Sequence, residues 1–415
     1  MFIRNKNNRL IQIDNYKIIS QLAKGGFGSV YHVKNVNDGS EYALKLLHNS
    51  INVSRIKTQL EVLKTLNTSE LFLKTYLSKK VMNRFLLVFE YTHEPNLEKL
   101  VHSHVFSEKE AIDFVLQLLN SLEFLHKKNI IHGYVKAENI VKRGDQYYLI
   151  DYDTAKIGSK IKTLHILNDD DFTAPEIYRG VEVYSCDIYS LGCVLYYLLT
   201  GEHIYDLKTN DDFSKKMFAH LYKKAIKNEK ISKKMFYLIM RMTDKDYKTR
   251  ADIEEIRTIL KDEHFDKEIQ DVKEIRDDFI SEYARYKYMA EDKILYAQNI
   301  FGLLHEDGIG VEKDNIEAFS WYETAANKGL AKAEFNLALC YKMAKGCSLD
   351  YKKSIDLFEK AAVQGHSRSY FHLGDIYEKG LGVDVDIKKA KFYYNNSAIN
   401  GYKPAYAKLK ELLKK

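Results

Sequence analysis

Residues 16–48, whose sequence is YKIISQLAKGGFGSVYHVKNVNDGSEYALKLLH, decide the fold of the chain. Two alternating, β-rich segments flank a cluster of glycines at Gly25, Gly26 and Gly28, and residues 37–39 (NDG) precede a third such segment. Alternating apolar and polar residues predict strands, and clusters of Asn, Asp and Gly predict tight turns. We therefore expect a strand, a glycine loop, a second strand, a turn and a third strand.

The pattern changes after this segment. It becomes helical from about residue 51, returns to a strand at residues 85–91 (FLLVFEY), and stays largely helical from residue 107 to residue 261. We expect a small sheet lobe followed by a larger helical lobe.

The bulk composition limits the classes of function. A length of 415 residues suggests two or three domains, and 45% hydrophobic with 29% charged residues is typical of globular chains. The formal net charge of +6 includes no long basic run, so we expect no nucleic-acid partner.

The sequence also predicts a compartment. The N-terminus has no continuous apolar segment, and the longest apolar run, residues 193–199, is too short to span a bilayer. The four cysteines form no CxxC pair, which favours free thiols in a reducing compartment. We expect no membrane span and an intracellular, cytoplasmic location.

Seven motifs follow one another between residues 23 and 250: AKGGFGSV, YALK, HGYVKAEN, IDYD, TAPE, CDIYSLG and a late arginine, Arg250. In this order they resemble the eukaryotic protein kinase family. The resemblance implies a bilobal α+β fold over residues 16–261, with an N-lobe at about 16–91 and a C-lobe at about 92–261. Residues 1–15 would form an N-terminal extension. The family's ligands, ATP and Mg²⁺, are implied as well.

The resemblance assigns nucleotide-binding roles to several residues. Glycine lacks a Cβ, so its backbone can approach phosphates closely, and Lys45 matches the lysine that holds the α- and β-phosphates. Three apolar residues would enclose the adenine, although ordinary sheet packing also explains Val30 and Ala43. The full set is Ala23, Gly25, Gly28, Val30, Ala43, Lys45, Glu90, Thr92 and Val141, in which Glu90 and Thr92 supply backbone contacts.

Asn139 and Asp151 match the family's magnesium ligands, and their amide and carboxylate oxygens suit that ion. Asp153 stands where the family has a flexible glycine. Its extra carboxylate offers a metal ligand or a base as an alternative.

The catalytic loop departs most from the family. Its His-Arg-Asp motif is His132-Gly133-Tyr134 here, and Lys136 is retained. A tyrosine, with a reference pKa near 10, is not a ready base at neutral pH, and general-base groups contribute roughly 10²- to 10⁴-fold to rate. We therefore expect Tyr134 to be inactive. Gly133 also removes the arginine that pairs with a phosphorylated activation loop.

The usual acidic partner of Lys45 is missing as well. Counting along the following helix places Gln59 where the family has glutamate. Glu61 lies two residues further on and would point elsewhere, so a bridge from Lys45 to Glu61 requires a shift of register.

Acidic residues at 169–171 precede the TAPE motif, and Asp169 takes the place of a threonine that contacts the catalytic loop. This run either mimics phosphorylation or forms a solvated acidic loop. Glu176 and Arg250 match the family's buried ion pair, and Asp187 matches the aspartate that braces the catalytic loop.

The C-terminal part is periodic. Gly329, Gly365 and Gly401 are each separated by 36 residues, and Asp, Ala and aromatic columns keep the same register. This block resembles the Sel1-like repeats, relatives of tetratricopeptide repeats. It implies an all-α solenoid of about three repeats over residues 297–415 with a C-terminal capping helix, YAKLKELLKK, joined by a helical linker at 262–296.

Three functions remain open, of which the third, a different nucleotide transfer on the same scaffold, has no specific sign in the sequence. The first is a pseudokinase scaffold that can bind ATP and uses its repeats for a protein partner. The alternative is an active or weakly active Ser/Thr-type kinase with a non-standard catalytic loop, because phosphoryl transfer relies mainly on positioning and electrostatics.

Overall fold

The computed structural model describes residues 2–4, 10–24, 28–47, 53–81, 84–104, 106–158, 171–205, 213–262, 282–400 and 402–412. They form two compact units. One comprises Met1–His104, Leu116–Ile157 and Ile399–Gly401, and the other comprises Val105–Val115, Gly158–Ala398 and Tyr402–Lys415. The predicted fold class is confirmed: a sheet lobe and a helical lobe precede an all-α run of helices.

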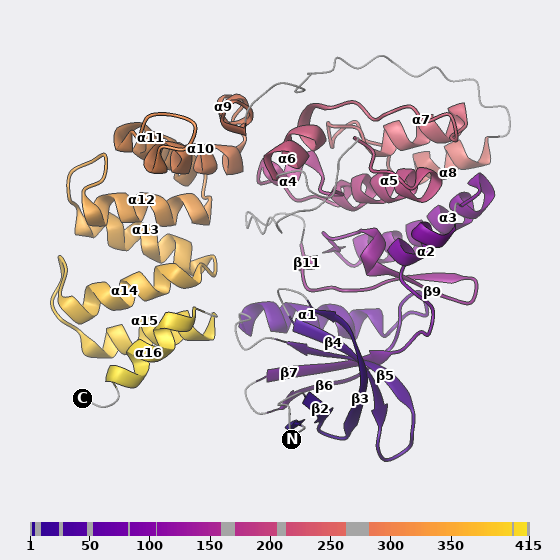
Figure 1. The fold of residues 1–415 in the computed structure, drawn as a ribbon, viewed down its shortest axis with the longest axis horizontal. Helices are drawn as coiled ribbons and strands as arrows, with labels where there is room; N and C mark the ends of the chain where they lie inside the picture. The colour runs from indigo at the N-terminus through magenta and orange to yellow at the C-terminus, as the bar shows by residue number, and fades with distance from the viewer. Residues whose placement is uncertain are drawn as a thin grey trace. The chain divides into compact units, whose positions relative to one another are not determined.

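The first unit is built on a seven-stranded antiparallel sheet with the order β1-β2-β3-β4-β5-β7-β6 (Figure 1). The first two strands come from residues 1–15, to which the sequence assigned no structure. The strands are β1 (Phe2–Arg4), β2 (Leu10–Ile13), β3 (Tyr16–Lys24), β4 (Gly28–Asn35), β5 (Glu41–Leu47), β6 (Thr75–Val81) and β7 (Arg84–Glu90).

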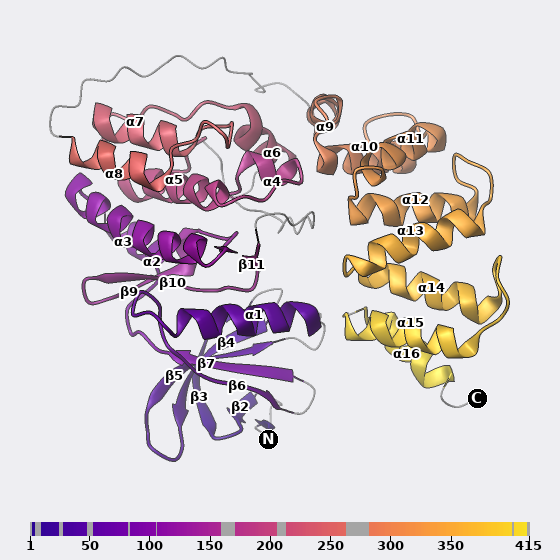
Figure 2. The same ribbon diagram turned by 180° about the vertical axis from the view of Figure 1, so that it is seen from behind.

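The side chains of the interior strand β5 alternate between the two faces of the sheet. Leu44 and Leu46 are fully buried in an apolar core that includes Leu86 and Val88 of β7. Lys45, between them, therefore points to the opposite face. In Figures 1 and 2, helix α1 (Val53–Leu66) lies across the sheet.

The rest of the first unit carries the catalytic loop on short elements. Two small antiparallel pairs, β9 with β10 and β8 with β11, flank this loop. The elements are α2 (Leu97–Ser103), β8 (Ile130–Ile131), the 3₁₀ turn η1 (Ala137–Asn139), β9 (Ile140–Arg143), β10 (Gln146–Leu149) and β11 (Lys156–Ile157). Helix α3 (Glu108–Lys127) lies between α2 and β8 in the chain, and its residues are divided between the two units.

The second unit contains five helices of the predicted C-lobe that follow β11 in the described residues. Helix α5 has nearly every residue buried, which matches its largely apolar sequence. The helices are α4 (Pro175–Tyr178), α5 (Ser185–Thr200), α6 (Phe213–Tyr222), α7 (Lys233–Met242) and α8 (Ile253–Lys261).

The repeat helices stack in chain order (Figures 1 and 2). They are α9 (Glu282–Glu291), α10 (Leu295–Asp307), α11 (Asn315–Ala326), α12 (Ala331–Met343), α13 (Tyr351–Val363), α14 (Ser367–Lys379), α15 (Ile387–Ile399) and α16 (Lys403–Leu412). Small residues let them approach closely, since a Cβ on Gly374 would lie 2.8 Å from the Tyr394 ring. Of the predicted linker 262–296, residues 263–281 lie outside the described residues.

The repeats and the C-lobe share a buried apolar cluster within the second unit. Helix α6 contributes Met217 and Phe218, and helix α9 contributes Tyr286 and Met289. The exposed fraction of Met217, Phe218 and Met289 is zero. In the part of the chain that the structure describes, no helix has both the length and the apolar composition needed to cross a membrane.

Candidate functional site

The centre of the candidate site is Lys45 on β5. Its backbone pairs with Val30 of β4 and Leu87 of β7, so the sheet fixes its position from both sides. Only 9% of its side chain is exposed. Its Nζ donates to Asp151 Oδ1 and to Asp153 Oδ2, each at 2.6 Å. Two carboxylates therefore neutralise one buried ammonium.

The segment 151–153 brings both carboxylates to the same side. Tyr152 between them is buried, with its ring 4.9 Å from His132 and its hydroxyl donating to Leu149 O at 2.7 Å. Asp151 has a φ of 65°, in the left-handed region that aspartate tolerates better than most residues. The anchored tyrosine thus directs its two neighbours toward Lys45.

Helix α1 contributes an amide to this cluster. Gln59 is buried, and its Nε2 donates to Asp153 Oδ1 at 2.5 Å. Gln59, which the sequence placed where the family has glutamate, therefore does lie in the Lys45 cluster. Glu61 is exposed, so the alternative bridge to Lys45 was wrong. The pairing of Asp153 with Lys45 was not predicted, because the two residues are 108 positions apart in the sequence.

The charged groups of the cluster shift one another's pKa values. Burial raises the pKa of Asp153 to about 6, the charge of Asp151 adds to this rise, and Lys45 opposes it. Desolvation also pushes the pKa of Asp151 upward, but Lys45 outweighs it and lowers that pKa. Burial disfavours the ammonium of Lys45, yet the two carboxylates raise its pKa. The lysine therefore stays charged.

The catalytic loop holds Tyr134 beside Lys136. The Nζ of Lys136 lies 4.3 Å from the centre of the Tyr134 ring, within the range of a cation–π contact, and 3.5 Å from Glu138 Oε1. The Tyr134 carbonyl accepts a hydrogen bond from Asn139 Nδ2 at 3.1 Å. Gly133, with a φ of 70°, provides the left-handed turn before the tyrosine.

The residues predicted to bind magnesium fit that ion chemically. Asn139 uses its amide nitrogen within the loop, and its amide oxygen is the atom that a hard cation prefers. Asp151 has 31% of its side chain exposed. Its neighbour Ile150 donates from the backbone to Asn139 O at 2.8 Å, which places the two segments side by side. Bound there, Mg²⁺ would neutralise phosphate charge.

Five of the residues predicted to contact nucleotide lie on β3, β4 and β5: Ala23, Gly28, Val30, Ala43 and Lys45. Ala23 pairs with Val30, and Ala43 pairs with Phe89. A Cβ on Gly28 would lie 2.6 Å from Leu46 O, so only glycine fits there without movement. Gly25 lies outside the described residues.

The predicted hinge is tied to the strand that carries Val141. The Thr92 hydroxyl donates to Lys142 O at 2.9 Å, and the Glu90 carboxylate pairs with Arg143. The backbone N–H of Glu90 donates to Lys74 O at 2.9 Å, so this donor is already used within the protein. These contacts join β7 to β9.

The acidic run before the TAPE motif is described only at its last residue. Asp171 is 14% exposed and lies 3.2 Å from Nζ of the buried Lys216 on α6. Asp171 is therefore in an ion pair, so the solvated-loop alternative does not hold at this position. Asp169 lies outside the described residues.

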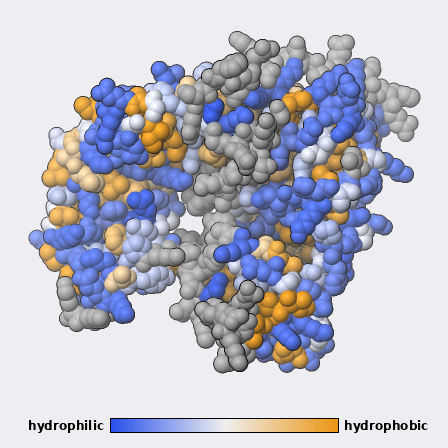
Figure 3. Space-filling model, in the orientation of Figure 1, coloured by the Kyte–Doolittle hydropathy of each residue, from blue (hydrophilic) through white to orange (hydrophobic). Residues whose placement is uncertain are grey.

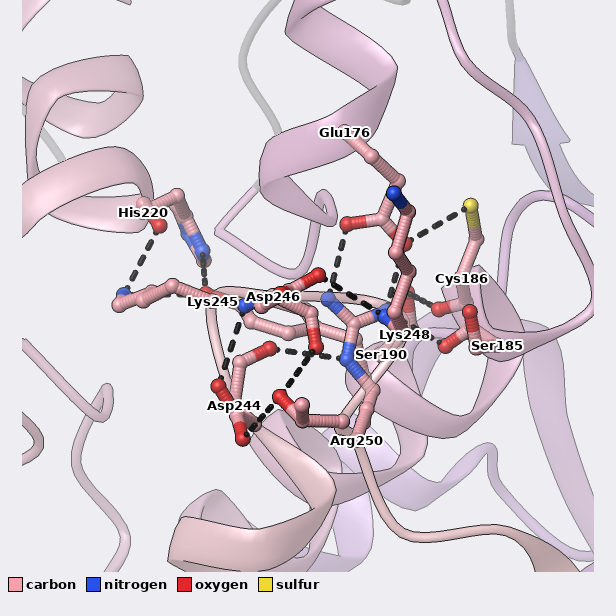
Figure 4. Close-up of polar contacts among 12 residues, drawn as sticks. Glu176, Ser185, Cys186, Ser190, His220, Asp244, Lys245, Asp246, Lys248 and Arg250 are labelled. Atoms are coloured by element: carbon pink, nitrogen blue, oxygen red, sulfur yellow. Dashed lines mark hydrogen bonds and ion pairs between the residues drawn. The ribbon is translucent and has the colours of Figure 1, made fainter.

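The predicted ion pair of the second unit is confirmed (Figure 4). Arg250 donates from its two terminal nitrogens to the Glu176 carboxylate at 2.5 and 2.8 Å. It also donates to Ser185 O at 2.8 Å and to Asp244 O at 2.9 Å. Both side chains are buried, so the guanidinium clamps three segments of the chain. Asp187 is buried in the first turn of α5.

A model of the protein kinase domain matches residues 16–265. The chain belongs to the protein kinase domain family. C-terminal to the kinase domain, a model of the Sel1 repeat matches three segments that are each 36 residues long: 295–330, 331–366 and 367–402. The repeat resemblance and its period are confirmed.

Several known kinases are similar to the chain. Calcium-dependent protein kinase 5 of Plasmodium falciparum is 28% identical over 329 residues, covering 74% of this chain and 55% of that protein. Aurora kinase of Saccharomyces cerevisiae is 28% identical over 50% of this chain and 59% of its own length. The chain spans about half the length of the curated relatives it matches first.

Proposed function

We propose that this chain is a pseudokinase scaffold, whose kinase domain binds ATP as a conformational ligand and whose Sel1 repeats bind a protein partner. The observation that carries the proposal is Tyr134 at the position of the family's catalytic aspartate. A neutral phenol does not take a proton from an attacking hydroxyl at pH 7, and its ring contacts the retained Lys136 at 4.3 Å.

The retained groups support nucleotide binding. Lys45 is charged and held in place by the sheet, and Asn139 with Asp151 offers oxygen ligands for a metal. This chemistry positions phosphates, but it supplies no base for the acceptor hydroxyl. Binding without efficient transfer is the expected result.

The repeat helices support a role in protein binding. They expose large apolar side chains at scattered positions, among them Ile316, Val363 and Phe392, with exposed fractions of 72%, 87% and 61%. Hydrophobic and hydrophilic residues alternate over the repeats in Figure 3. Non-obligate protein interfaces contain a similar proportion of apolar area to the rest of a protein surface, so a partner can bind such a surface without a large apolar patch.

The test is transfer of radiolabelled phosphate from Mg-ATP to the protein itself and to a generic protein substrate. Asp151→Asn serves as the control, because it removes the metal-binding carboxylate. We expect no label above that control. Label that depends on Asp151 would overturn the proposal and favour the Ser/Thr-type kinase.

A second variant separates a missing base from a defective scaffold. Tyr134→Asp restores the carboxylate at the position that the catalytic loop provides. Transfer that appears only in this variant would support the proposal that Tyr134 is what prevents catalysis. Equal transfer by both proteins would contradict it.

A further inference from the structure

We propose that Asp153 is the positioning residue for Lys45 in nucleotide binding, and that it replaces an acidic side chain on helix α1, where this chain has Gln59. The inference rests on the proposed binding of nucleotide and specifies which residue orients the phosphate-binding lysine. It also gives a function to the carboxylate that occupies a position where the family has glycine.

Each carboxylate oxygen of Asp153 accepts a hydrogen bond from a different residue. Oδ2 accepts from Lys45 Nζ at 2.6 Å, and Oδ1 accepts from Gln59 Nε2 at 2.5 Å. The side chain of Asp153 is only 6% exposed, and that of Lys45 is 9% exposed. A single carboxylate therefore joins strand β5 to helix α1.

The charges explain why an acid is required at one of these two places. A buried ammonium is stable only when an opposite charge or several hydrogen bonds compensate it, and an amide supplies no charge. Gln59 is a hydrogen-bond donor to Asp153, so α1 contributes polarity without charge. The negative charge comes from the loop after β10 instead, and Gln59 keeps the helix attached to it.

The presence of two aspartates permits a division of tasks. Asp151 is 31% exposed and is the residue whose carboxylate suits a cation, whereas Asp153 is enclosed. With Asp153 paired to Lys45, Asp151 is available for a metal without leaving the buried lysine uncompensated. Asp153 acts through Lys45, so it is a positioning residue and not a catalytic one.

The experiment moves the carboxylate from position 153 to position 59 in the full chain. The variants are Asp153→Asn, Gln59→Glu and the double variant Gln59→Glu/Asp153→Asn. Asp145→Asn is the matched control, because Asp145 is exposed in the turn between β9 and β10. The first measurement is the dissociation constant for trinitrophenyl-ATP, a fluorescent ATP analogue, with and without Mg²⁺.

We expect Asp153→Asn to weaken binding of the analogue about 10- to 100-fold, the size expected for loss of a hydrogen bond to a charged group. The double variant should recover most of this loss, because it returns a carboxylate to the lysine from the helix. Asp145→Asn should bind like the parent chain. Binding by Asp153→Asn within twofold of the parent, or a double variant as weak as Asp153→Asn, would overturn the inference.

The thermal midpoint without nucleotide is the second measurement. It separates failure of this inference from failure of the proposed nucleotide binding. If the parent chain does not bind the analogue, Asp153→Asn should still lower the midpoint and the double variant should still restore it. If the midpoint falls further in the double variant than in either single variant, a carboxylate at position 59 does not replace the one at position 153, and the inference is rejected.

Discussion

Replacing Phe218 by alanine should loosen the contact between α6 of the kinase domain and α9 of the repeat region. Phe218 has no exposed surface, and its ring centre lies 4.9 Å from that of Tyr222 and 5.9 Å from that of Tyr288 on α9. Truncation of a buried phenylalanine to alanine costs about 3–5 kcal/mol. The pair across the two helices accounts for about 0.5–1.5 kcal/mol beyond the buried area.

Hydrogen–deuterium exchange of peptides from α9 measures this loss locally. Since 1.4 kcal/mol corresponds to a factor of ten, amides of α9 that exchange through opening of this contact should exchange at least about tenfold faster in Phe218→Ala. The matched control is Phe392→Ala on α15, because Phe392 is 61% exposed. This control should change stability by no more than about 0.5 kcal/mol.

The reasoning is refuted if α9 exchanges within twofold of the parent rate in Phe218→Ala. That result would mean that α6 and α9 do not share a packed core in solution. Faster exchange in both variants would indicate a general loss of stability. It would also contradict the claim that Phe218 stabilises α9 through a local contact.

Three further results are expected. Arg250→Ala leaves Glu176 as an uncompensated buried charge and should destabilise the chain by about 3–5 kcal/mol in chemical denaturation, whereas a loss below 1 kcal/mol contradicts a buried pair. Gly374→Ala places a Cβ 2.8 Å from the Tyr394 ring and should lower the thermal midpoint of the repeats, at a cost of about 1–3 kcal/mol; an unchanged midpoint argues against this packing. Burial, together with nearby positive charges, lowers the pKa of His366 to about 4 from 6.5, so folding favours its neutral form. Its contribution is complete above pH 6.5 and is lost as the pH falls toward 4; His366→Gln should flatten that part of the stability profile, and an identical profile would contradict the shift.

Local patterns in the sequence predicted the strands around the glycine loop and the helical repeats. The repeat period of 36 residues follows from columns that recur at each turn of the solenoid, where Gly374 and Tyr394 must fit together. The Glu176–Arg250 pair was predicted as well, because ordered motifs identify the family and the family shares this contact. The strands β1 and β2 were missed, since short segments at a sheet edge carry weak alternation.

The sequence alone determined the kinase fold, the Sel1 repeats and the replacement of the catalytic aspartate by Tyr134, because each depends on residue identity within an ordered or periodic pattern. Tertiary structure decided how Lys45 is compensated. The carboxylates come from Asp151 and Asp153, 106 and 108 positions away, and Gln59 of α1 binds the other oxygen of Asp153. Such contacts depend on which side chains the fold brings into one buried space, where each charge requires a partner, and sequence spacing does not contain that information.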